Sequence, residues 1–186
     1  MQLYENKFVK ALDYLSSPSM LNPTGDKPIC YVVYDVKDAS IIQDMIPNGF
    51  KSRAEHYGFN IHVFSVGEKI NEYIRNHEYY EIWKDDSIEE LDLFDSIRTE
   101  IDDKQFLENS LLDFQSSLLN ESEKSLILIK DLELLHPFHK IGAIENRIYN
   151  RIQLPMLILY PGNAQGTART FLNIYNMDGN YRSKNF

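Results

Sequence analysis

The chain has 186 residues, of which 43% are hydrophobic, so it can bury one substantial core and we expect a single domain over residues 1–186. No apolar run approaches the ~18 residues of a membrane span, and charged residues interrupt the first apolar stretch, which argues against a membrane helix and a signal peptide; we expect a cytoplasmic protein. The single Cys30 excludes an internal disulfide and a multi-cysteine zinc site, and within "ICYVVY" we expect it to be buried.

The net charge of -9 is distributed unevenly along the chain. Residues 68–123 contain 17 acidic and five basic residues, whereas residues 138–186 contain six basic and two acidic residues. The acidic excess argues against unassisted binding to duplex DNA, because affinity for DNA comes largely from cations that neutralise phosphates. Such a separation of charge suits docking onto a partner protein with a complementary field. The same pattern is also typical of the solvated faces of helices.

In the first third of the chain, apolar residues at helical spacing alternate with runs of β-branched and aromatic residues. Pro47 and Gly49 fall inside the second predicted helix and must break or kink it, because proline removes a backbone donor and clashes with the preceding turn. The predicted elements are a helix at 4–15, a strand at 29–35, a helix from 38 to about 57 and a strand at 59–66.

The middle of the chain contains a long acidic segment at residues 83–120, which follows a predicted helix from Gly67 to about His77. Its apolar residues, Leu91 and Ile97 among them, recur at spacings of three and four, which predicts two helices with residues 102–105 as their joint. We expect these helices to form an excursion from the sheet edge within the one domain.

The last third of the chain returns to short apolar runs. Pro161 and Gly162 are expected to turn the chain away from the strand that precedes them. The predicted elements are a strand at 125–130, a helix near 138–152, a strand at 155–160, an edge strand at 169–174 and a turn at 178–179.

Four apolar strands that alternate with helices predict a three-layer α/β fold, in which helices flank a mostly parallel sheet. We expect an order of elements like that of P-loop nucleotide hydrolases, in which a buried strand delivers a carboxylate to Mg²⁺. The sequence nevertheless has no G-x-x-x-x-G-K-S/T phosphate-binding loop, and the segment after the first strand, "DVKDAS", contains no glycine. We therefore expect no bound cofactor.

Two acidic residues directly follow predicted strands, Asp35 after the first and Asp131 after the third. Because the carboxyl ends of parallel strands meet at one edge of a sheet, these carboxylates could lie side by side and form an unorthodox nucleotide site. The more common interpretation is that each carboxylate caps a helix or a turn. His136 and His139 do not form a helical metal pair, because Pro137 lies between them, and we expect no metal site.

Two segments of opposite charge are candidate surfaces for binding a partner protein. In the basic tail a tyrosine and an arginine stand together, as they often do at protein interfaces. The alternative for this tail is a C-terminal strand in which Tyr181 covers the sheet edge and Arg182 pairs with a carboxylate. The candidate residues are Glu89, Glu90, Asp92 and Asp95 in the acidic segment and Arg169, Tyr181 and Arg182 in the tail.

Several short stretches together resemble a known family. They are "LSSPSML", the strand end Tyr34-Asp35, Asp131 with "LLHPF", "LPMLILYPG", Phe171-Leu172 and the terminal "GNYR". On these stretches the chain resembles the BrxB component of the bacteriophage exclusion systems called BREX, and the most specific part runs from "LYPGNAQG" to "NYR", at residues 159–182. The family usually has two tyrosines before the final arginine of this motif, whereas Asn180 precedes Tyr181 here.

The resemblance implies a small intracellular bacterial protein, encoded with a phage-defence cluster, that has no catalytic activity of its own and contacts PglZ, a component of the alkaline phosphatase superfamily. We therefore expect a non-catalytic scaffold or adaptor that binds a PglZ-like protein and other BREX components, without binding membranes or nucleic acid directly. The alternative is a nucleotide-binding or hydrolysing regulator that uses Asp35 and Asp131. A role as a nucleic-acid accessory protein would need a coherent basic face on the C-terminal segment.

Overall fold

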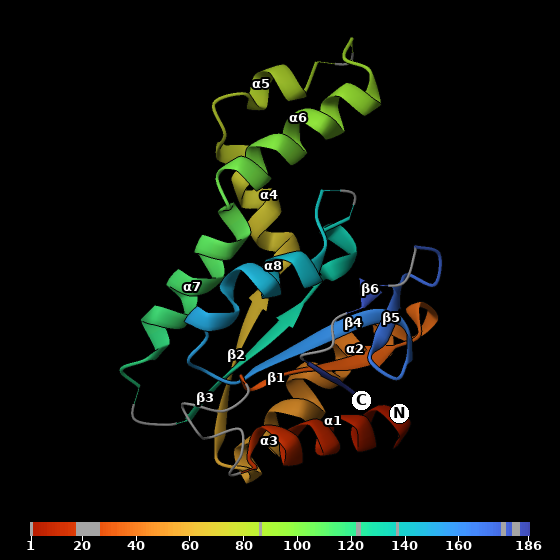
Figure 1. Ribbon diagram of the computed structural model, residues 1–186, viewed down its shortest axis with the longest axis vertical. Helices are drawn as coiled ribbons and strands as arrows, with labels where there is room; N and C mark the ends of the chain where they lie inside the picture. Colours follow the sequence, from red (N-terminus) through yellow and green to blue (C-terminus); the bar gives the residue numbers. More distant parts are fainter. Residues whose placement is uncertain are drawn as a thin grey trace.

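The structure is a computed structural model that describes residues 2–17, 27–85, 87–121, 124–136, 138–175, 178–179 and 183–186, with residues 178–179 described by their backbone alone. Helices cover both faces of a mostly parallel sheet, which confirms the predicted three-layer α/β fold (Figure 1). The α-helices are α1 (Gln2–Leu15), α2 (Ala39–Met45), α3 (Lys51–His56), α4 (Val66–Asn76), α5 (Tyr80–Trp83), α6 (Glu90–Asp103), α7 (Phe106–Leu118) and α8 (Ile141–Ile148). The strands are β1 (Ile29–Tyr34), β2 (Phe59–Ser65), β3 (Lys124–Lys130), β4 (Met156–Gln165), β5 (Ala168–Phe171), β6 (Asp178–Gly179) and β7 (Lys184–Asn185).

The strands of the main sheet follow the order β2-β3-β4-β1-β7, and every neighbouring pair in this path is parallel. Tyr31 of β1 lies opposite Ile158 of β4, and Ile127 of β3 lies opposite Met156 of β4. Every residue of β1 is buried, because helices cover both faces of the sheet and leave such a strand no solvated side. β4 thus separates β1 from β3, and this spacing determines where the carboxylates at their ends lie.

Two apolar layers hold the helices against the sheet. On one face Phe8 of α1 stacks on Phe50 with ring centroids 4.0 Å apart, and both rings are fully buried. On the other face, residues of α7 and α8 pack with Ile129 and Ile158. Burying a side chain of this size stabilises a fold by about 1.5–3 kcal/mol relative to leaving it in water.

Both helix interruptions predicted from the sequence are confirmed. Between α2 and α3 the chain forms a π-helical turn, Ile46–Phe50, which contains Pro47 and Gly49. Between α6 and α7 the backbone of Gln105 is left-handed, with φ 47°, so the joint predicted at residues 102–105 is present.

The prediction that Pro161 and Gly162 turn the chain off the sheet is wrong. β4 continues to Gln165 and forms an antiparallel hairpin with β5, which is shorter than the edge strand predicted there. Gly162 has φ 144°, and a Cβ atom at this position would collide with the carbonyl oxygen of Thr170. Glycine is therefore needed at this position for the close approach of β5, and not for a turn.

Only the first part of the acidic segment predicted at residues 83–120 projects from the sheet, because α7 packs in the core through residues such as Leu107 and Leu111. We call this projection the arm, defined as residues 77–104. It contains α5 and α6, which lie side by side beyond the end of α4 and extend away from the sheet (Figure 1). We call the rest of the described chain the body.

Candidate functional site

Asp35 follows β1 and caps the turn that comes next. Its carboxylate accepts a hydrogen bond from the backbone nitrogen of Lys37 at 3.2 Å and lies 3.0 Å from the Lys37 ammonium. The hydrogen bonds from the Lys37 side chain and backbone lower the pKa of Asp35. In the place where a phosphate-binding loop would begin α2, the chain forms a 3-10 helix, η1 (Val36–Asp38). Asp35 thus has the structural role of a cap.

Asp131, at the end of β3, is held by side chains from three elements. Its Oδ2 atom accepts a hydrogen bond from Ser65 Oγ at 2.6 Å and lies 2.7 Å from Lys130 Nζ. Its Oδ1 atom accepts a hydrogen bond from Gln43 Nε2 at 2.9 Å. Burial alone would raise the pKa of Asp131, but the hydrogen bonds from Lys130, Ser65 and Gln43 lower it. The carboxylate therefore joins β2, β3 and α2.

Asp35 and Asp131 do not form the paired site that their positions suggested. No contact between them is present among the described residues, because β4 lies between the strands that they follow. A nucleotide site built on both carboxylates would have to lie between β1 and β3. A groove of about 400 Å³ lies instead over the ends of β2 and β3, where Asp131 and Ser65 share its wall with apolar residues such as Leu134 and Phe138.

The two histidines of "HPFH" have different neighbours. His136 lies against Tyr175 with ring centroids 3.8 Å apart, and burial, together with the charge of Lys140, lowers its pKa. His139 points its Nε2 atom toward Glu108, whose Oε1 atom is 3.6 Å away. Within the described part of the chain, no three His, Cys, Asp or Glu side chains are grouped as a metal site would require.

Arg169, predicted to lie on a partner-binding surface, is 0% exposed, so that prediction is wrong. Its guanidinium carbon lies 3.6 Å from the ring centroid of Tyr31 and 5.5 Å from that of Tyr160. It also donates a hydrogen bond to Asn185 Oδ1 at 2.8 Å. A planar cation with an apolar stem packs well over aromatic rings, and here it ties the C-terminal strand to the sheet.

Glu145 was not identified from the sequence, although it is buried and bonds to Tyr31, the residue over whose ring Arg169 lies. Its carboxylate accepts hydrogen bonds from the hydroxyl groups of Tyr31 and Ser183. The helical spacing contained the signal, because positions 141, 144, 145 and 148 share one face and the other three are isoleucines. A carboxylate on an apolar face must find partners from other elements, and β1 and the C-terminal residues supply them.

Tyr181 and Arg182, the other two candidates in the tail, lie outside the described residues. The residues that follow belong to the fold, because β7 pairs with β1 and the backbone nitrogen of Phe186 donates to the Tyr31 carbonyl at 2.8 Å. A C-terminal strand is therefore present, as in the alternative interpretation of the tail. The roles of Tyr181 and Arg182 stay predictions.

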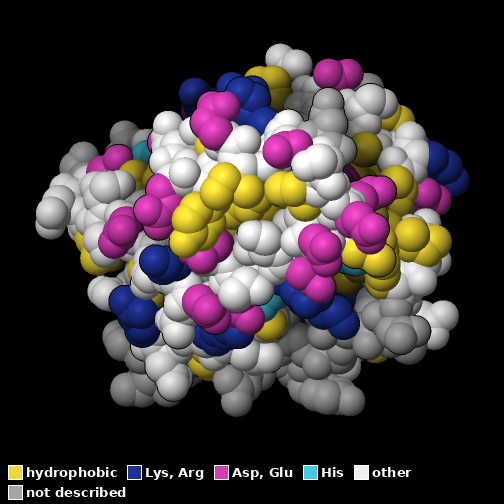
Figure 2. All heavy atoms as spheres, turned by 90° about the horizontal axis from the view of Figure 1, so that it is seen from above, with side chains coloured by type: hydrophobic (Ala, Val, Ile, Leu, Met, Phe, Trp, Pro, Cys, Tyr) yellow, Lys and Arg dark blue, Asp and Glu magenta, His cyan; other side chains and the backbone are white. Residues whose placement is uncertain are grey.

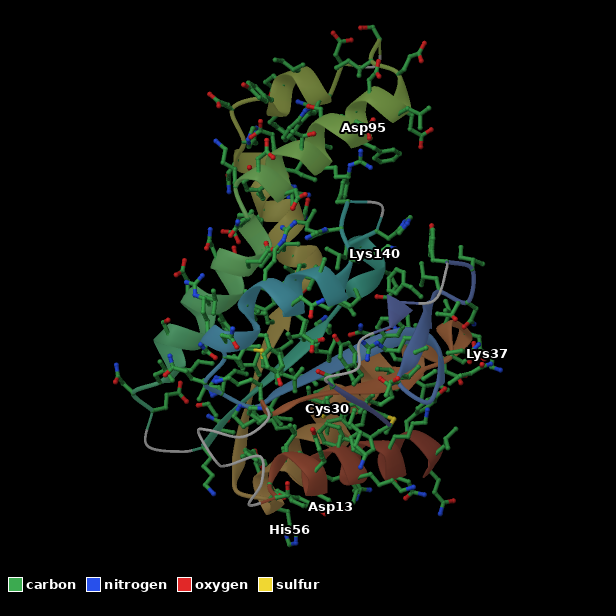
Figure 3. All side chains as sticks on the ribbon, in the orientation of Figure 1. Asp13, Cys30, Lys37, His56, Asp95 and Lys140 are labelled. Atoms are coloured by element: carbon green, nitrogen blue, oxygen red, sulfur yellow. The ribbon has the colours of Figure 1, made fainter. Side chains whose placement is uncertain are left out.

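The acidic candidates Glu89, Glu90, Asp92 and Asp95 are all exposed and lie at the start of α6, in the arm. Asp95, labelled in Figure 3, forms an exposed ion pair with Arg98 at 2.9 Å. The other three form no ion pair within the part of the chain that the structure describes. These three carboxylates therefore lie in solvent, without a side-chain cation from the described residues.

Three large apolar side chains of the arm are exposed: Tyr79 by 40%, Ile82 by 57% and Leu91 by 76%. The helical spacing had placed Leu91 on the same face as Ile97, but only Ile97 is buried, because the start of α6 extends beyond the elements that cover the rest of the helix. Figure 2, which views the molecule from the end where the arm lies, shows hydrophobic side chains gathered in a band with acidic side chains on both sides.

The arm is nonetheless held in place by an aromatic cluster at its base. Trp83 of α5 stacks on His77, with ring centroids 4.5 Å apart, and its Nε1 atom donates to Ser96 of α6 at 3.0 Å. Below them, Tyr73 of α4 lies 4.2 Å from Phe106 of α7, measured between ring centroids. The exposed side chains of the arm are therefore carried by two helices, α5 and α6, that contact each other through Trp83 and Ser96.

No described helix is long and apolar enough to cross a membrane. In comparisons of the chain with protein families, with curated proteins and with solved structures, nothing matches.

Proposed function

We propose that this protein is a non-catalytic adaptor subunit of a BREX-type antiphage defence system in the bacterial cytoplasm, and that it binds a PglZ-like partner through the arm. The resemblance of residues 159–182 to the BrxB family supports the choice of system. The observation that carries the proposal is the arm, where acidic and apolar side chains stay exposed on ordered helices. A mixed surface that its own chain leaves uncovered is typical of a protein docking site.

The two carboxylates at strand ends support a non-catalytic role. Asp35 is engaged by Lys37, and both oxygens of Asp131 accept hydrogen bonds. Binding a magnesium nucleotide at Asp131 would cost the hydrogen bonds from Ser65 and Gln43, which hold β2 and α2 to the end of β3. The adaptor therefore works by positioning other proteins.

Capture of the PglZ-like protein by immobilised adaptor tests this proposal. The variant Glu89→Lys/Glu90→Lys/Asp92→Lys reverses three exposed charges without touching the core, and we expect it to reduce capture at least about tenfold, which corresponds to about 1.4 kcal/mol. Capture by the unmodified adaptor should also weaken as salt rises, because salt screens exposed charges.

The matched control is Asp44→Lys/Glu55→Lys/Asp113→Lys, which reverses three exposed acids on α2, α3 and α7 in the body. We expect this control to capture the partner as well as the unmodified chain does. Equal capture by the arm variant would remove the arm as the contact surface, and no capture by the unmodified chain would refute the adaptor function.

Calorimetric titration with ATP or GTP and Mg²⁺ tests the alternative of a nucleotide regulator. We expect no binding at submillimolar nucleotide. A micromolar dissociation constant that Asp131→Asn abolishes would favour the regulator over the adaptor.

A further inference from the structure

The exposed apolar side chains of the arm come from two neighbouring helices. Tyr79 and Ile82 lie three residues apart at α5, and Leu91 lies in the first turn of α6. We call these three residues the apolar band. Large apolar side chains that remain exposed together on ordered helices mark interaction sites far more often than isolated ones do.

Ile82 and Leu91 contribute little to the packing of the arm, whereas Tyr79 also contacts the rings of His77 and Trp83. Ile97 and Ile101 are the buried apolar residues of α6, and Trp83 is the buried residue of α5. Trp83 faces His77 and Ser96, whereas Ile82, the next residue along the chain, is exposed. The two helices thus use one face to hold together and leave the other to solvent.

The charge around the apolar band indicates what kind of partner would cover it. Residues 77–104 contain 11 acidic and three basic residues. Glu90 and Asp92 lie in the first turn of α6, where the helix dipole favours acids. That effect applies also to Glu81 in the first turn of α5, but it does not explain the exposed acids Glu78 and Asp95, nor the exposed Leu91. A partner that buries the band must therefore carry positive charge at its rim.

We propose that the apolar band receives a basic amphipathic helix of the partner protein. This inference rests on the proposed adaptor function and names the chemistry of its contact. The band lies on one turn of α5 and the first turn of α6, where a helix of the partner could lie across both. The apolar face of the incoming helix would contact Ile82 and Leu91, while its lysines and arginines would meet the surrounding carboxylates.

Other occupants fit the charge of the arm poorly. A second copy of the chain would bring its own acidic arm against the first, and like charges brought together at an interface cost several kcal/mol. Anionic membrane surfaces and nucleic acids are repelled for the same reason. A basic helix is the occupant whose apolar and charged sides both match.

The probe for this site is a fluorescent peptide of about 14 residues, in which leucines recur at helical spacing and lysines fill the other positions. A second peptide has the same composition, but its leucines and lysines alternate, so that it has no apolar helical face. We expect the unmodified protein to bind the helical peptide at least about tenfold more tightly than the alternating one, as measured by anisotropy.

Two variants separate the apolar and the charged contributions. Ile82→Ser/Leu91→Ser keeps every acid, and we expect it to lose the preference for the helical peptide. Glu89→Lys/Glu90→Lys/Asp92→Lys keeps the band, and we expect it to weaken both peptides. The matched control is Leu3→Ser/Ile174→Ser in the body, because these residues are 61% and 75% exposed, against 57% and 76% for Ile82 and Leu91.

Three results would overturn the inference. They are equal binding of the two peptides, an unchanged preference in Ile82→Ser/Leu91→Ser, and photo-crosslinks from the helical peptide that map outside residues 78–95 of the unmodified protein. The photo-crosslinking experiment uses the unmodified protein, so its result does not depend on whether a variant folds.

Capture of the PglZ-like protein separates this inference from the adaptor function. If Ile82→Ser/Leu91→Ser captures the partner as well as the unmodified chain does, the inference fails and the adaptor function stands. If the unmodified chain captures no partner but prefers the helical peptide, the adaptor function fails and the band stands as a site for basic helices.

Discussion

Every residue of β1 is buried between helices on both faces, whereas α6, with 14 residues, buries only Ile97 and Ile101. In the body, β3 is buried from Ser125 to Ile129 and β4 from Met156 to Gly162, and polar groups such as Glu145 and Arg169 are enclosed with partners. In the arm, carboxylates and apolar side chains share the surface. The body thus buries a larger share of its side chains than the arm does.

The body therefore supplies most of the stability of the fold, and the arm supplies the proposed contact surface. Side chains enclosed on every side dominate the free energy of unfolding, and most of them lie in the body, whereas the arm encloses only a few, such as Ile97 and Ile101. An element attached through few buried contacts opens at lower free energy than the global transition. Its exposed residues can therefore be exchanged at little cost, which is what a surface devoted to a partner requires.

The largest effect should come from the centre of the sheet. Leu157 of β4 is fully buried, and Leu157→Ala should lower the free energy of unfolding by about 3 kcal/mol, because it leaves a cavity that the close-packed layer cannot fill. Urea denaturation measures this loss. The same exchange in the arm, Leu91→Ala, should change stability by less than about 0.5 kcal/mol. Equal losses at both positions would show that the start of α6 is packed after all.

A smaller loss should follow when the buried arginine is removed. Arg169→Ala deletes the cation that lies over Tyr31 and leaves Asn185 without its donor, so we expect a loss of about 2 kcal/mol. Arg98→Ala in the arm removes only an exposed pair with Asp95 and should cost less than about 0.5 kcal/mol. A loss of stability at Arg169 as small as that at Arg98 would contradict the buried position of the Arg169 side chain.

Local sequence patterns predicted most elements of the body. They failed where the structure depends on contacts between segments far apart in the sequence. The continuous apolar runs of β1 and β3 predicted buried parallel strands, and Pro47 predicted the interruption between α2 and α3. The continuation of β4 through Gly162 was not predictable in this way. It depends on the approach of β5, and the local sequence of β4 contains no sign of that approach.

At the candidate site, too, local sequence placed some residues correctly and others wrongly. Charge counts placed Glu89 and Asp92 on the surface, since carboxylates without partners stay in water. Arg169 was wrongly placed there as well, because its burial needs the rings of Tyr31 and Tyr160, which other strands supply. Leu91 fitted a helical stripe, but the stripe cannot show where the covering elements end.

Removing the aromatic anchor of the arm should loosen the arm and leave the body intact. Trp83→Ala deletes the stacking on His77 and the hydrogen bond to Ser96. We expect amides of α5 and α6 to exchange hydrogen at least about tenfold faster, while the global free energy of unfolding falls by less than about 1 kcal/mol. Faster exchange throughout β1 and β4 would mean that the arm and the body unfold as one unit.

The smallest effect concerns pH and the carboxylate that closes the end of β3. Burial tends to raise the pKa of Asp131, but the hydrogen bonds from Lys130, Ser65 and Gln43 outweigh it and lower the pKa. A carboxyl group whose pKa is lower in the folded state stabilises the fold above its unfolded value of about 3.9, and this contribution is lost as pH falls through the folded value. Asp131→Asn should therefore be less stable than the unmodified chain at pH 7, and the difference should shrink below about pH 4.

Thermal unfolding followed between about pH 2.5 and pH 7 measures this difference, with Asp95→Asn as the matched exchange in the arm. Among the described residues the Asp95 carboxylate pairs only with the exposed Arg98, so its exchange should leave stability within about 0.5 kcal/mol of the unmodified chain. A difference for Asp131→Asn that stays constant down to the lowest pH would mean that its ionised form is not what joins β2 to α2. The carboxylate at the end of β3 would then be free for another task, and the nucleotide alternative would regain support.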